Sequence, residues 1–425
     1  MKAQGPASSS LDALLAQARE EAARFFRTSD GGDGDDDGDA ADGASPPTTP
    51  AAVLFCAPSL AAAGLSACGH QAGGHHHQSG ELPASMVDPS RGTFCKLLPA
   101  DRRAAREERW YARAAEAPSS SALAELYRDF MPRYHGVARV AGRWVLVLDD
   151  VFAGAAGPRS AGGPKRQQQE QQQQQQQRRP GAPTPHRRRC VMDVKLGRAT
   201  SYPWAPPELR AKCERKDAST TQRALGLRLC GVRCERLVGG DGCSAPVAVW
   251  SKDRHWGKAL AGADDVRAAL RRFAALGDDE EPAAAGSEGG LLWSWRQRRR
   301  RRRLAALAAE VGRLRACVAQ LPHVRLFSAS VLLLLEEAEE EEQRGDGGEG
   351  EGEGEGEGDD DDRRRQCRAR VALVDFAHAF VRPSSSLFEG PDDSVLAGLD
   401  ALRQALLLGA AAQAGSAAAA TTGAE

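Results

Sequence analysis

The stretch CVMDVKLGR, residues 190–198, is rich in Val, Leu and Met and predicts a buried β-strand. Asp193 and Lys195 are two positions apart, so on an extended backbone both side chains point to the same face. A carboxylate and an ammonium group on an apolar strand need partners, because unpaired charges are costly to bury. The pattern indicates either a surface ion pair at a strand end or a site for a charged ligand.

The rest of the foldable chain shows both helical and strand-like patterns. Helical spacing of apolar residues occurs in 11–27, 101–115 and 263–274. Strand character marks 142–151, 190–195, 227–232, 324–335 and 370–376. Because strands occur both with and without intervening helices, the order predicts an α+β fold.

Four segments have a composition that cannot bury enough apolar surface to offset chain entropy. They are the Asp/Gly tract 30–50, the Gln/Arg/Pro tract 159–189, the loop 277–290 and the Glu/Gly/Asp tract 337–366. Two of them separate one strand from the next. We therefore expect disordered loop insertions in one catalytic-sized body.

The formal net charge of −1, from 57 Lys+Arg and 58 Asp+Glu in 425 residues, hides a strong segregation of charge. Seven Asp lie in 30–43 and sixteen acidic residues lie in 336–362. Outside these tracts the chain is basic, which favours a body that binds anionic ligands.

Composition also argues against several classes of protein. No stretch approaches the ~20 apolar residues that cross a bilayer, and the N-terminus lacks the apolar run of a secretory signal. The ten scattered Cys indicate free thiols in a reducing, intracellular setting. Cys230, Cys234 and Cys243 lack the paired spacing of a zinc site.

The segment VALVDFAH, residues 371–378, carries four apolar residues into Asp375. An Asp at the end of a buried strand needs a cation or hydrogen-bond donors. Mg²⁺ bound to nucleotide phosphates is one such partner, and a capped turn is the alternative.

Lys96 lies in the apolar run GTFCKLLP, ahead of Glu107 and Glu108 in a predicted helix. A strand Lys that reaches phosphates and is held by a helix Glu is a phosphotransferase arrangement.

In the segment 207–226, Lys212 and Lys216 stand i, i+4 on one face of a helix that Pro207 can begin. This basic ridge favours a polyanionic substrate, and a solvated helix face is the alternative. The run Arg298–Arg303 is typical of nuclear import or of a solvated tract, and it has almost no interleaved aromatic residues beyond Trp293 and Trp295. We therefore expect no direct nucleic-acid function.

Six motifs occur in an order that resembles the inositol polyphosphate kinase family, most closely its plant and algal multikinase type. They are Lys96, LVLDDV at 146–151, VMDVKLG at 191–197, KCERKDASTTQRALGLRLCG at 212–231, FSASVLLLLEE at 327–337 and VALVDFAH at 371–378. GHQAGGH at 69–75 resembles the family's glycine-rich segment. The chain departs from the family pattern where Arg189 replaces a Pro of the signature and Val331 replaces a second Ser.

The resemblance implies a two-lobed kinase fold, similar to protein kinases and ATP-grasp enzymes, with antiparallel sheets and a helical substrate-binding insert at 207–226. The expected divisions are an N-terminal helix and acidic tract at 1–50, a first lobe at 51–158, the insertion at 159–189, a second lobe at 190–408 and an Ala-rich tail at 409–425.

The resemblance also implies a role for each candidate residue. Lys96 would contact the nucleotide phosphates, with Glu107 orienting it, and the hinge of Leu148, Asp149, Asp150 and Val151 would meet adenine through its backbone. Asp193 would hold the ribose hydroxyls, Lys195 would bridge the γ-phosphate and the substrate, and Asp375 would bind Mg²⁺. Lys212 and Lys216 would bind inositol phosphates, and His378 would lie near the substrate.

The function expected from the resemblance is ATP- and Mg²⁺-dependent phosphorylation of inositol tris- and tetrakisphosphates towards the pentakisphosphate. An inositol hexakisphosphate kinase-like enzyme and a catalytically weak nuclear scaffold that binds inositol phosphates are the alternatives. Phosphoinositide head groups are further possible ligands. We expect a monomer in the nucleus and cytoplasm.

Overall fold

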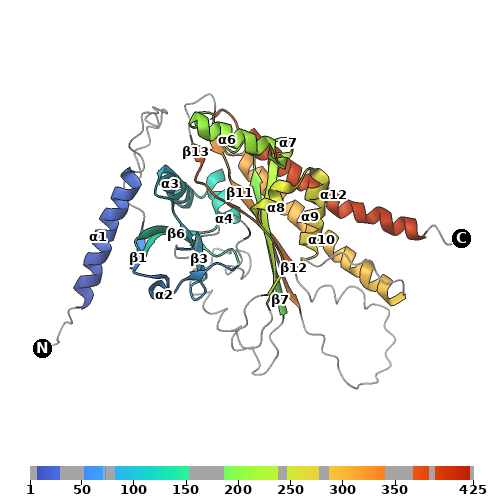
Figure 1. The fold of residues 1–425 in the computed structure, drawn as a ribbon, viewed down its shortest axis with the longest axis horizontal. Helices are drawn as coiled ribbons and strands as arrows, with labels where there is room; N and C mark the ends of the chain where they lie inside the picture. Colours follow the sequence, from blue (N-terminus) through green and yellow to red (C-terminus); the bar gives the residue numbers. More distant parts are fainter. Residues whose placement is uncertain are drawn as a thin grey trace, which may run out of the picture.

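The computed structural model describes most of the chain outside the low-complexity tracts (Figure 1). The described residues are 7–28, 52–69, 72, 82–152, 186–237, 247–276, 287–339, 367–381 and 388–421. The predicted insertion 159–189 lies outside them up to residue 185, and the predicted insertion 337–366 lies outside them from residue 340.

The N-terminal half forms a six-stranded sheet in the order β1-β5-β6-β4-β3-β2, antiparallel except for the pair β1–β5. Its strands are β1 (Val53–Ala57), β2 (Ser66–Ala67), β3 (Ser85–Asp88), β4 (Thr93–Leu97), β5 (Tyr134–Val140) and β6 (Arg143–Asp149). Its helices are α1 (Ala7–Thr28), α2 (Leu60–Ala63), α3 (Arg102–Glu116) and α4 (Ala122–Phe130). The helices predicted at 11–27 and 101–115 are therefore confirmed as α1 and α3.

The C-terminal half forms an antiparallel five-stranded sheet in the order β12-β11-β7-β8-β9. Its strands are β7 (His186–Leu196), β8 (Leu227–Leu237), β9 (Val247–Lys252), β11 (Ser330–Glu339) and β12 (Cys367–Val374), and a separate pair is formed by β10 (Val324–Leu326) and β13 (Ala379–Val381). Its helices are α6 (Pro207–Ala218), α7 (Thr221–Leu225), α8 (Arg254–Ala259), α9 (Ala263–Ala274), α10 (Ser287–Ala319) and α12 (Asp393–Thr421). The two sheets with their separate helices confirm the predicted α+β class.

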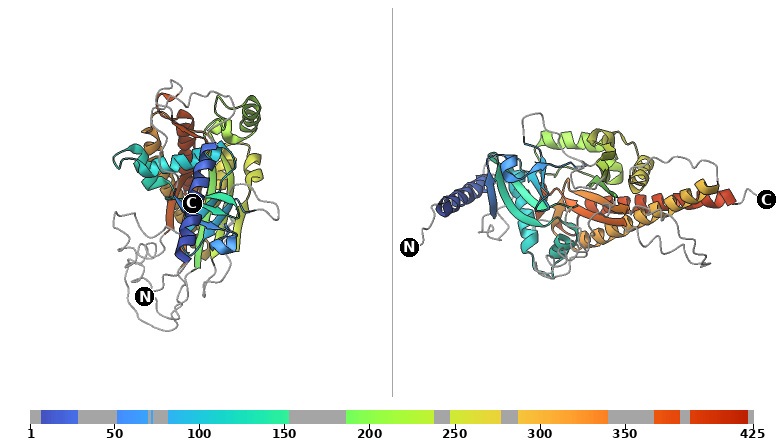
Figure 2. Two further views of the ribbon diagram at one scale, coloured as in Figure 1. Left: turned by 90° about the vertical axis from the view of Figure 1, so that its left-hand side faces the viewer. Right: turned by 90° about the horizontal axis from the view of Figure 1, so that it is seen from below.

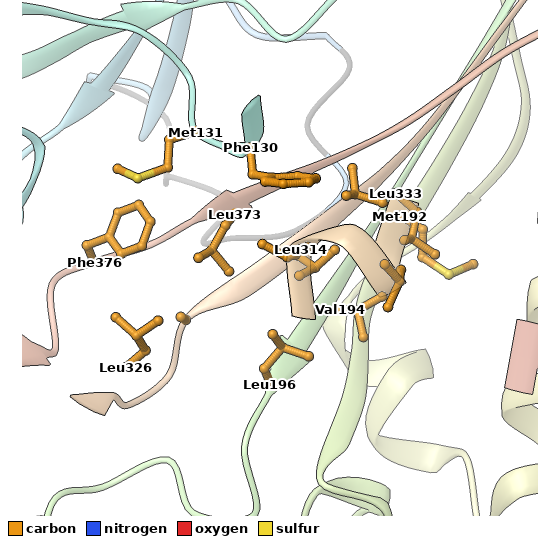
Figure 3. Close-up of a cluster of buried hydrophobic side chains, with 14 of the residues drawn as sticks. Phe130, Met131, Met192, Val194, Leu196, Leu314, Leu326, Leu333, Leu373 and Phe376 are labelled. Carbon is orange, nitrogen blue, oxygen red and sulfur yellow. The ribbon is translucent and has the colours of Figure 1, made fainter. Parts of the chain in front are cut away.

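One face of the five-stranded sheet forms the centre of the main hydrophobic core. Alternate residues of β7, Met192, Val194 and Leu196, are fully buried on this face, as Leu333 and Leu373 are on β11 and β12. Figure 3 shows these side chains together with Leu314 of α10 and with Phe130 and Met131 from the end of α4. Because side chains alternate along a strand, the opposite face of β7 is left for Asp193 and Lys195.

Helices α10 and α12 pack side by side and cover the core face of the sheet (Figure 2). The segment Asp393–Ala411 of α12 is long and apolar enough to cross a membrane by length and composition. Its residues Leu399, Leu402 and Leu406, however, are fully buried at helical spacing within the main core. This pattern is typical of a core helix.

The strands β7 and β11 continue into segments that the sequence predicted to be insertions. Residues 186–189 belong to β7, and residues 337–339 belong to β11. In the ladder Arg188 lies opposite Glu337 and Arg189 lies opposite Glu336. Opposite charges on neighbouring strands stabilise the pairing, so these charged residues lengthen the sheet.

The arginine run also differs from the predicted solvated tract. It lies in α10, where Arg300 and Arg303 are buried. Arg303 donates to both carboxylate oxygens of Glu337 at 2.8 Å, and Arg299 donates to the same group. The prediction of a solvated run is therefore wrong for these three arginines, and β11 supplies Arg299 and Arg303 with a buried acidic partner.

Candidate active site

The second face of the five-stranded sheet carries the two charged residues of β7. In the ladder Asp193 lies between Leu332 of β11 and Gly231 of β8, and Lys195 lies between Ser330 and Arg228. β7 is the central strand of the sheet, and the Lys195 side chain is only 16% exposed and contacts Asp375 and the Ser328 carbonyl, which argues against a surface ion pair with Asp193.

The same face becomes apolar two residues earlier along β7. Val191 packs with Leu334, Ala372 and Phe152, together with Ala72 from the predicted glycine-rich segment. The other residues of that segment beyond Gly69 lie outside the described part of the chain. Successive positions on one face of a strand are about 6.6 Å apart. Over the three successive positions 191, 193 and 195, which are two equal steps apart, the face therefore changes from an apolar row to a carboxylate and then to cations.

Asp375 follows β12 directly and has a left-handed backbone with a φ of 67°. This conformation is uncommon outside glycine, although Asp and Asn are among the residues that adopt it. The next residue, Phe376, is fully buried, and its ring stacks on Trp110 of α3 at a centroid distance of 5.3 Å. The Phe376 N–H donates to Glu107 Oε1 at 3.3 Å. These contacts anchor the backbone at Asp375 against α3.

Lys96 of β4 contacts one carboxylate from each half of the chain, Glu107 of α3 and Asp375 after β12. Its Nζ lies 2.7 Å from Glu107 Oε1 and 2.7 Å from Asp375 Oδ1, and Lys195 Nζ lies 3.7 Å from Asp375 Oδ2. The predicted pairing of Lys96 with Glu107 is present. Glu108 instead accepts a hydrogen bond from the Tyr134 hydroxyl at 2.7 Å.

The charges in this cluster shift one another's pKa values. Burial acts to raise the pKa of Asp375, but the nearby ammonium groups of Lys96 and Lys195 outweigh it and hold the pKa well below the ordinary range. Burial would lower the pKa of Lys96, and the carboxylates of Asp375 and Glu107 raise it instead. Asp375 and Lys96 are therefore both charged at neutral pH.

Asp193 is in a different environment. Burial raises its pKa, while the Lys195 ammonium opposes that rise. Among the described residues, Asp193 Oδ1 is a buried oxygen without a hydrogen-bond partner. A buried acceptor of this kind is a place for a ligand hydroxyl, because buried polar atoms are normally paired.

The helix α6 places its two candidate lysines differently. Lys216 is half-buried, and burial lowers its pKa, with Arg228 and Lys195 acting in the same direction. Its ammonium group therefore lies within electrostatic reach of Lys195 and Arg228 on the sheet. Lys212 is exposed one turn earlier on the helix.

Three further cations at the site were missed in the sequence. Arg228 is buried, and among the described residues its Nε and Nη1 have no hydrogen-bond partner. Arg103 and Arg106 of α3 lie within electrostatic reach of His378. Arg228 could have been found from its place directly opposite Lys195, but only once the register of β7 and β8 was known.

The predicted hinge is partly occupied by its own hydrogen bonds. Leu148 is buried in β6, the Asp149 N–H donates to the Arg133 carbonyl, and the Asp150 N–H donates to the Gly92 carbonyl. The Asp149 carboxylate lies 2.7 Å from His135 Nε2. These two N–H groups are therefore not available to a base at the hinge.

His378 lies beside the cations, and its pKa is lowered to about 4. Burial is the largest cause, followed by Arg106, Arg103 and Lys195, while Asp101 acts weakly in the opposite direction. The ordinary pKa of a histidine is about 6.5. Between about pH 6.5 and about pH 4 the imidazole of His378 is protonated in the unfolded chain but neutral in the folded chain. The free energy of unfolding therefore decreases as pH falls through this window.

We therefore expect the free energy of unfolding to fall less steeply between about pH 6.5 and about pH 4 in a His378→Gln variant than in the wild type. Urea unfolding at several pH values measures this slope. Equal slopes for the two proteins would contradict the burial of a neutral His378 among cations.

A half-buried lysine held by a helix glutamate, a carboxylate after a strand and a basic sheet face define a phosphotransferase-type site. The comparison with known families agrees, since residues 184–407, more than half of the chain, match the family model described as inositol polyphosphate kinase. The chain belongs to this family.

The inositol polyphosphate multikinase IPK2 of Oryza sativa is 31% identical over 237 residues, which are 52% of this chain and 66% of the relative. The inositol polyphosphate multikinase beta of Arabidopsis thaliana is 31% identical over 170 residues, which are 39% of this chain and 45% of the relative. The chain thus spans just under two thirds of the length of the rice relative.

A solved structure of the multikinase Ipk2 from S. cerevisiae, in complex with ADP and Mn²⁺, is also similar. It is 17% identical, with a TM-score of 0.42, and the match covers 74% of this chain and 98% of that chain.

Proposed function

We propose that this protein is an ATP- and divalent-metal-dependent kinase that phosphorylates hydroxyl groups of inositol tris- and tetrakisphosphates. The observation that carries the proposal is the gradual change from apolar to charged side chains along one face of the five-stranded sheet. It runs from the apolar row at Val191, through the unpartnered oxygen of Asp193, to the cations Lys195 and Arg228. Base, ribose and phosphates of a nucleotide follow one another in the same order.

Each part of the nucleotide would meet matching chemistry. The base would lie on the apolar row beside Val151, and a ribose hydroxyl would donate to Asp193 Oδ1. The phosphates would meet Lys96 and Lys195. The names of the rice and Arabidopsis relatives, both multikinases, support the kinase proposal as a whole.

The donor set also fits a hard divalent cation such as Mg²⁺. Mg²⁺ typically takes one or two carboxylates together with phosphate oxygens and water. Asp375 is a charged carboxylate placed next to both phosphate-binding lysines. No cluster of three or more His, Cys, Asp or Glu occurs in the described part of the chain, so the nucleotide would supply the remaining ligands. Bound there, the metal would neutralise charge on the phosphoryl group being transferred.

The acceptor would bind beyond Lys195, where the cations gather. Lys216, Arg228, Arg103 and Arg106 approach this region from three different elements. A site with so many cations favours an acceptor that carries several phosphates over a neutral alcohol.

We expect the purified protein with ATP, Mg²⁺ and inositol 1,4,5-trisphosphate to form more highly phosphorylated products, with unphosphorylated inositol as the control that does not react. Raising NaCl from about 50 to about 300 mM should raise the acceptor KM several-fold, because salt screens the attraction. Product-resolved chromatography measures both effects. Nucleotide binding without turnover on any inositol phosphate would favour the scaffold alternative.

We also propose that the protein occurs in the nucleus as well as the cytoplasm. Arg296, Arg298 and Arg302 of α10 are exposed, which supports recognition of the run by an import receptor. Replacing these three by Gln, without touching buried Arg300 and Arg303, tests the proposal by microscopy. An unchanged distribution would argue against it.

A further inference from the structure

A chain of hydrogen bonds links Lys195 to the helix α6. Lys195 Nζ donates to the Ser328 carbonyl at 2.7 Å, and the Ser328 hydroxyl donates to the Thr200 carbonyl at 2.9 Å. The Thr200 N–H and hydroxyl both donate to the carboxylate of Asp217, each at 2.8 Å. The path thus runs from β7 to Ser328, which is distant in sequence, returns to Thr200 in the segment that follows β7, and ends on the helix that carries Lys216.

The residues of this path make their polar contacts inside the protein rather than with a ligand. Thr200 and Asp217 are only 4% and 3% exposed, so their polar groups face each other rather than a ligand. Asp217 lies next to Lys216, with its Oδ1 3.8 Å from Lys216 Nζ. Every polar atom that the path uses is paired, as buried hydrogen-bonding groups require.

The backbone at Ser328 supports this view. Its φ of 58° is in the left-handed region, which is uncommon for a residue with a Cβ. Such a conformation persists where the surroundings determine it, and it is enriched near functional sites. Here the Lys195 ammonium fixes the Ser328 carbonyl, and Thr200 fixes its hydroxyl.

We propose that Thr200, Asp217 and Ser328 are positioning residues that fix α6 relative to Lys195, so that the acceptor hydroxyl lies in line with the transferred phosphate. This inference rests on the proposed kinase function. Lys195 lies on β7 and Lys216 lies on α6, and both must bind the same rigid acceptor molecule. A small shift of α6 would therefore misplace the acceptor while leaving the nucleotide groups on β4, β7 and Asp375 in place.

The path predicts which kinetic constants change. Thr200→Val removes the hydroxyl that donates to Asp217, and Ser328→Ala removes the hydroxyl that donates to Thr200 but keeps the carbonyl that holds Lys195. We expect each variant to raise the acceptor KM about tenfold, the factor that corresponds to one lost hydrogen bond, with nucleotide affinity unchanged within about twofold. Thr200→Ser keeps the hydroxyl and should restore the wild-type KM.

The experiment compares acceptor KM, kcat, the Kd of Mg²⁺-ATP and the melting temperature for these variants. Ser219→Ala is the matched control, because the Ser219 hydroxyl donates to the Lys216 carbonyl at the exposed end of α6, outside the path. The double variant Thr200→Val with Ser328→Ala should cost less than the product of the single effects, since both break one path.

Two outcomes would overturn the inference in distinguishable ways. If the wild type is active but both variants lose thermal stability with an unchanged acceptor KM, the path is only structural and the proposed function stands. If the wild type phosphorylates no inositol phosphate, the kinase proposal and this inference fall together. Ser328→Ala keeps the buried Thr200–Asp217 pair, so it remains informative even where Thr200→Val does not fold.

Discussion

An Asp375→Asn variant should lose at least about 10³-fold in kcat for phosphoryl transfer while keeping its fold. Asp375 is the carboxylate that both Lys96 and Lys195 approach, and it is the residue we assign to the metal. An amide cannot balance these charges or bind a divalent cation with comparable strength. Asn tolerates the left-handed φ of 67°, so the backbone should not change.

The measurement is steady-state kinetics at saturating ATP and acceptor, together with a circular dichroism spectrum. Asp400→Asn on α12 is a suitable control, because the Asp400 carboxylate pairs with Arg315 of α10 at 2.7 Å rather than with a residue of the site. Activity of Asp375→Asn within tenfold of the wild type would remove Asp375 from the metal site and from the reaction.

Local patterns in the sequence predicted the parts of the site that lie on single strands. The spacing of Asp193 and Lys195 put both on one face of β7, and the apolar run before Asp375 placed it at a strand end. The pairing of Lys96 with Glu107 followed from a strand Lys and a helix Glu that recur together in phosphotransferases. Each of these predictions needed only the alternation of side chains along one strand or a known motif.

The features that depend on register could not be predicted in the same way. Arg228 lies opposite Lys195 because the pairing of β7 and β8 shifts between Asp193 and Val194, where Cys230 is the extra residue of a bulge. Arg103 and Arg106 reach His378 through the packing of α3, which no local pattern encodes. The substrate end of the site is therefore a tertiary property.

The arginine run was misinterpreted for a similar reason. A block of like charges is usually solvated. Its acidic partner, Glu337, belongs to a tract whose composition suggests an insertion, and β11 carries it back against α10. Composition treats both segments as solvated, whereas Arg303 and Glu337 are buried against each other.

Glu337 is 5% exposed and balances the buried guanidinium groups of Arg299 and Arg303. Replacing it by Gln should lower the free energy of unfolding by about 3–5 kcal/mol, because loss of one partner leaves buried charges uncompensated. Glu336→Gln, the same substitution one residue earlier, affects a more accessible group that meets Arg370 at 3.2 Å and should cost about 1 kcal/mol. Urea unfolding of the two variants separates these cases. Equal losses of unfolding free energy in the two variants would mean that Glu337 is not the counter-ion of Arg299 and Arg303. A much larger loss at Glu337 would show that these arginines belong to the folded core. In that case only the exposed arginines of α10 remain available to another protein.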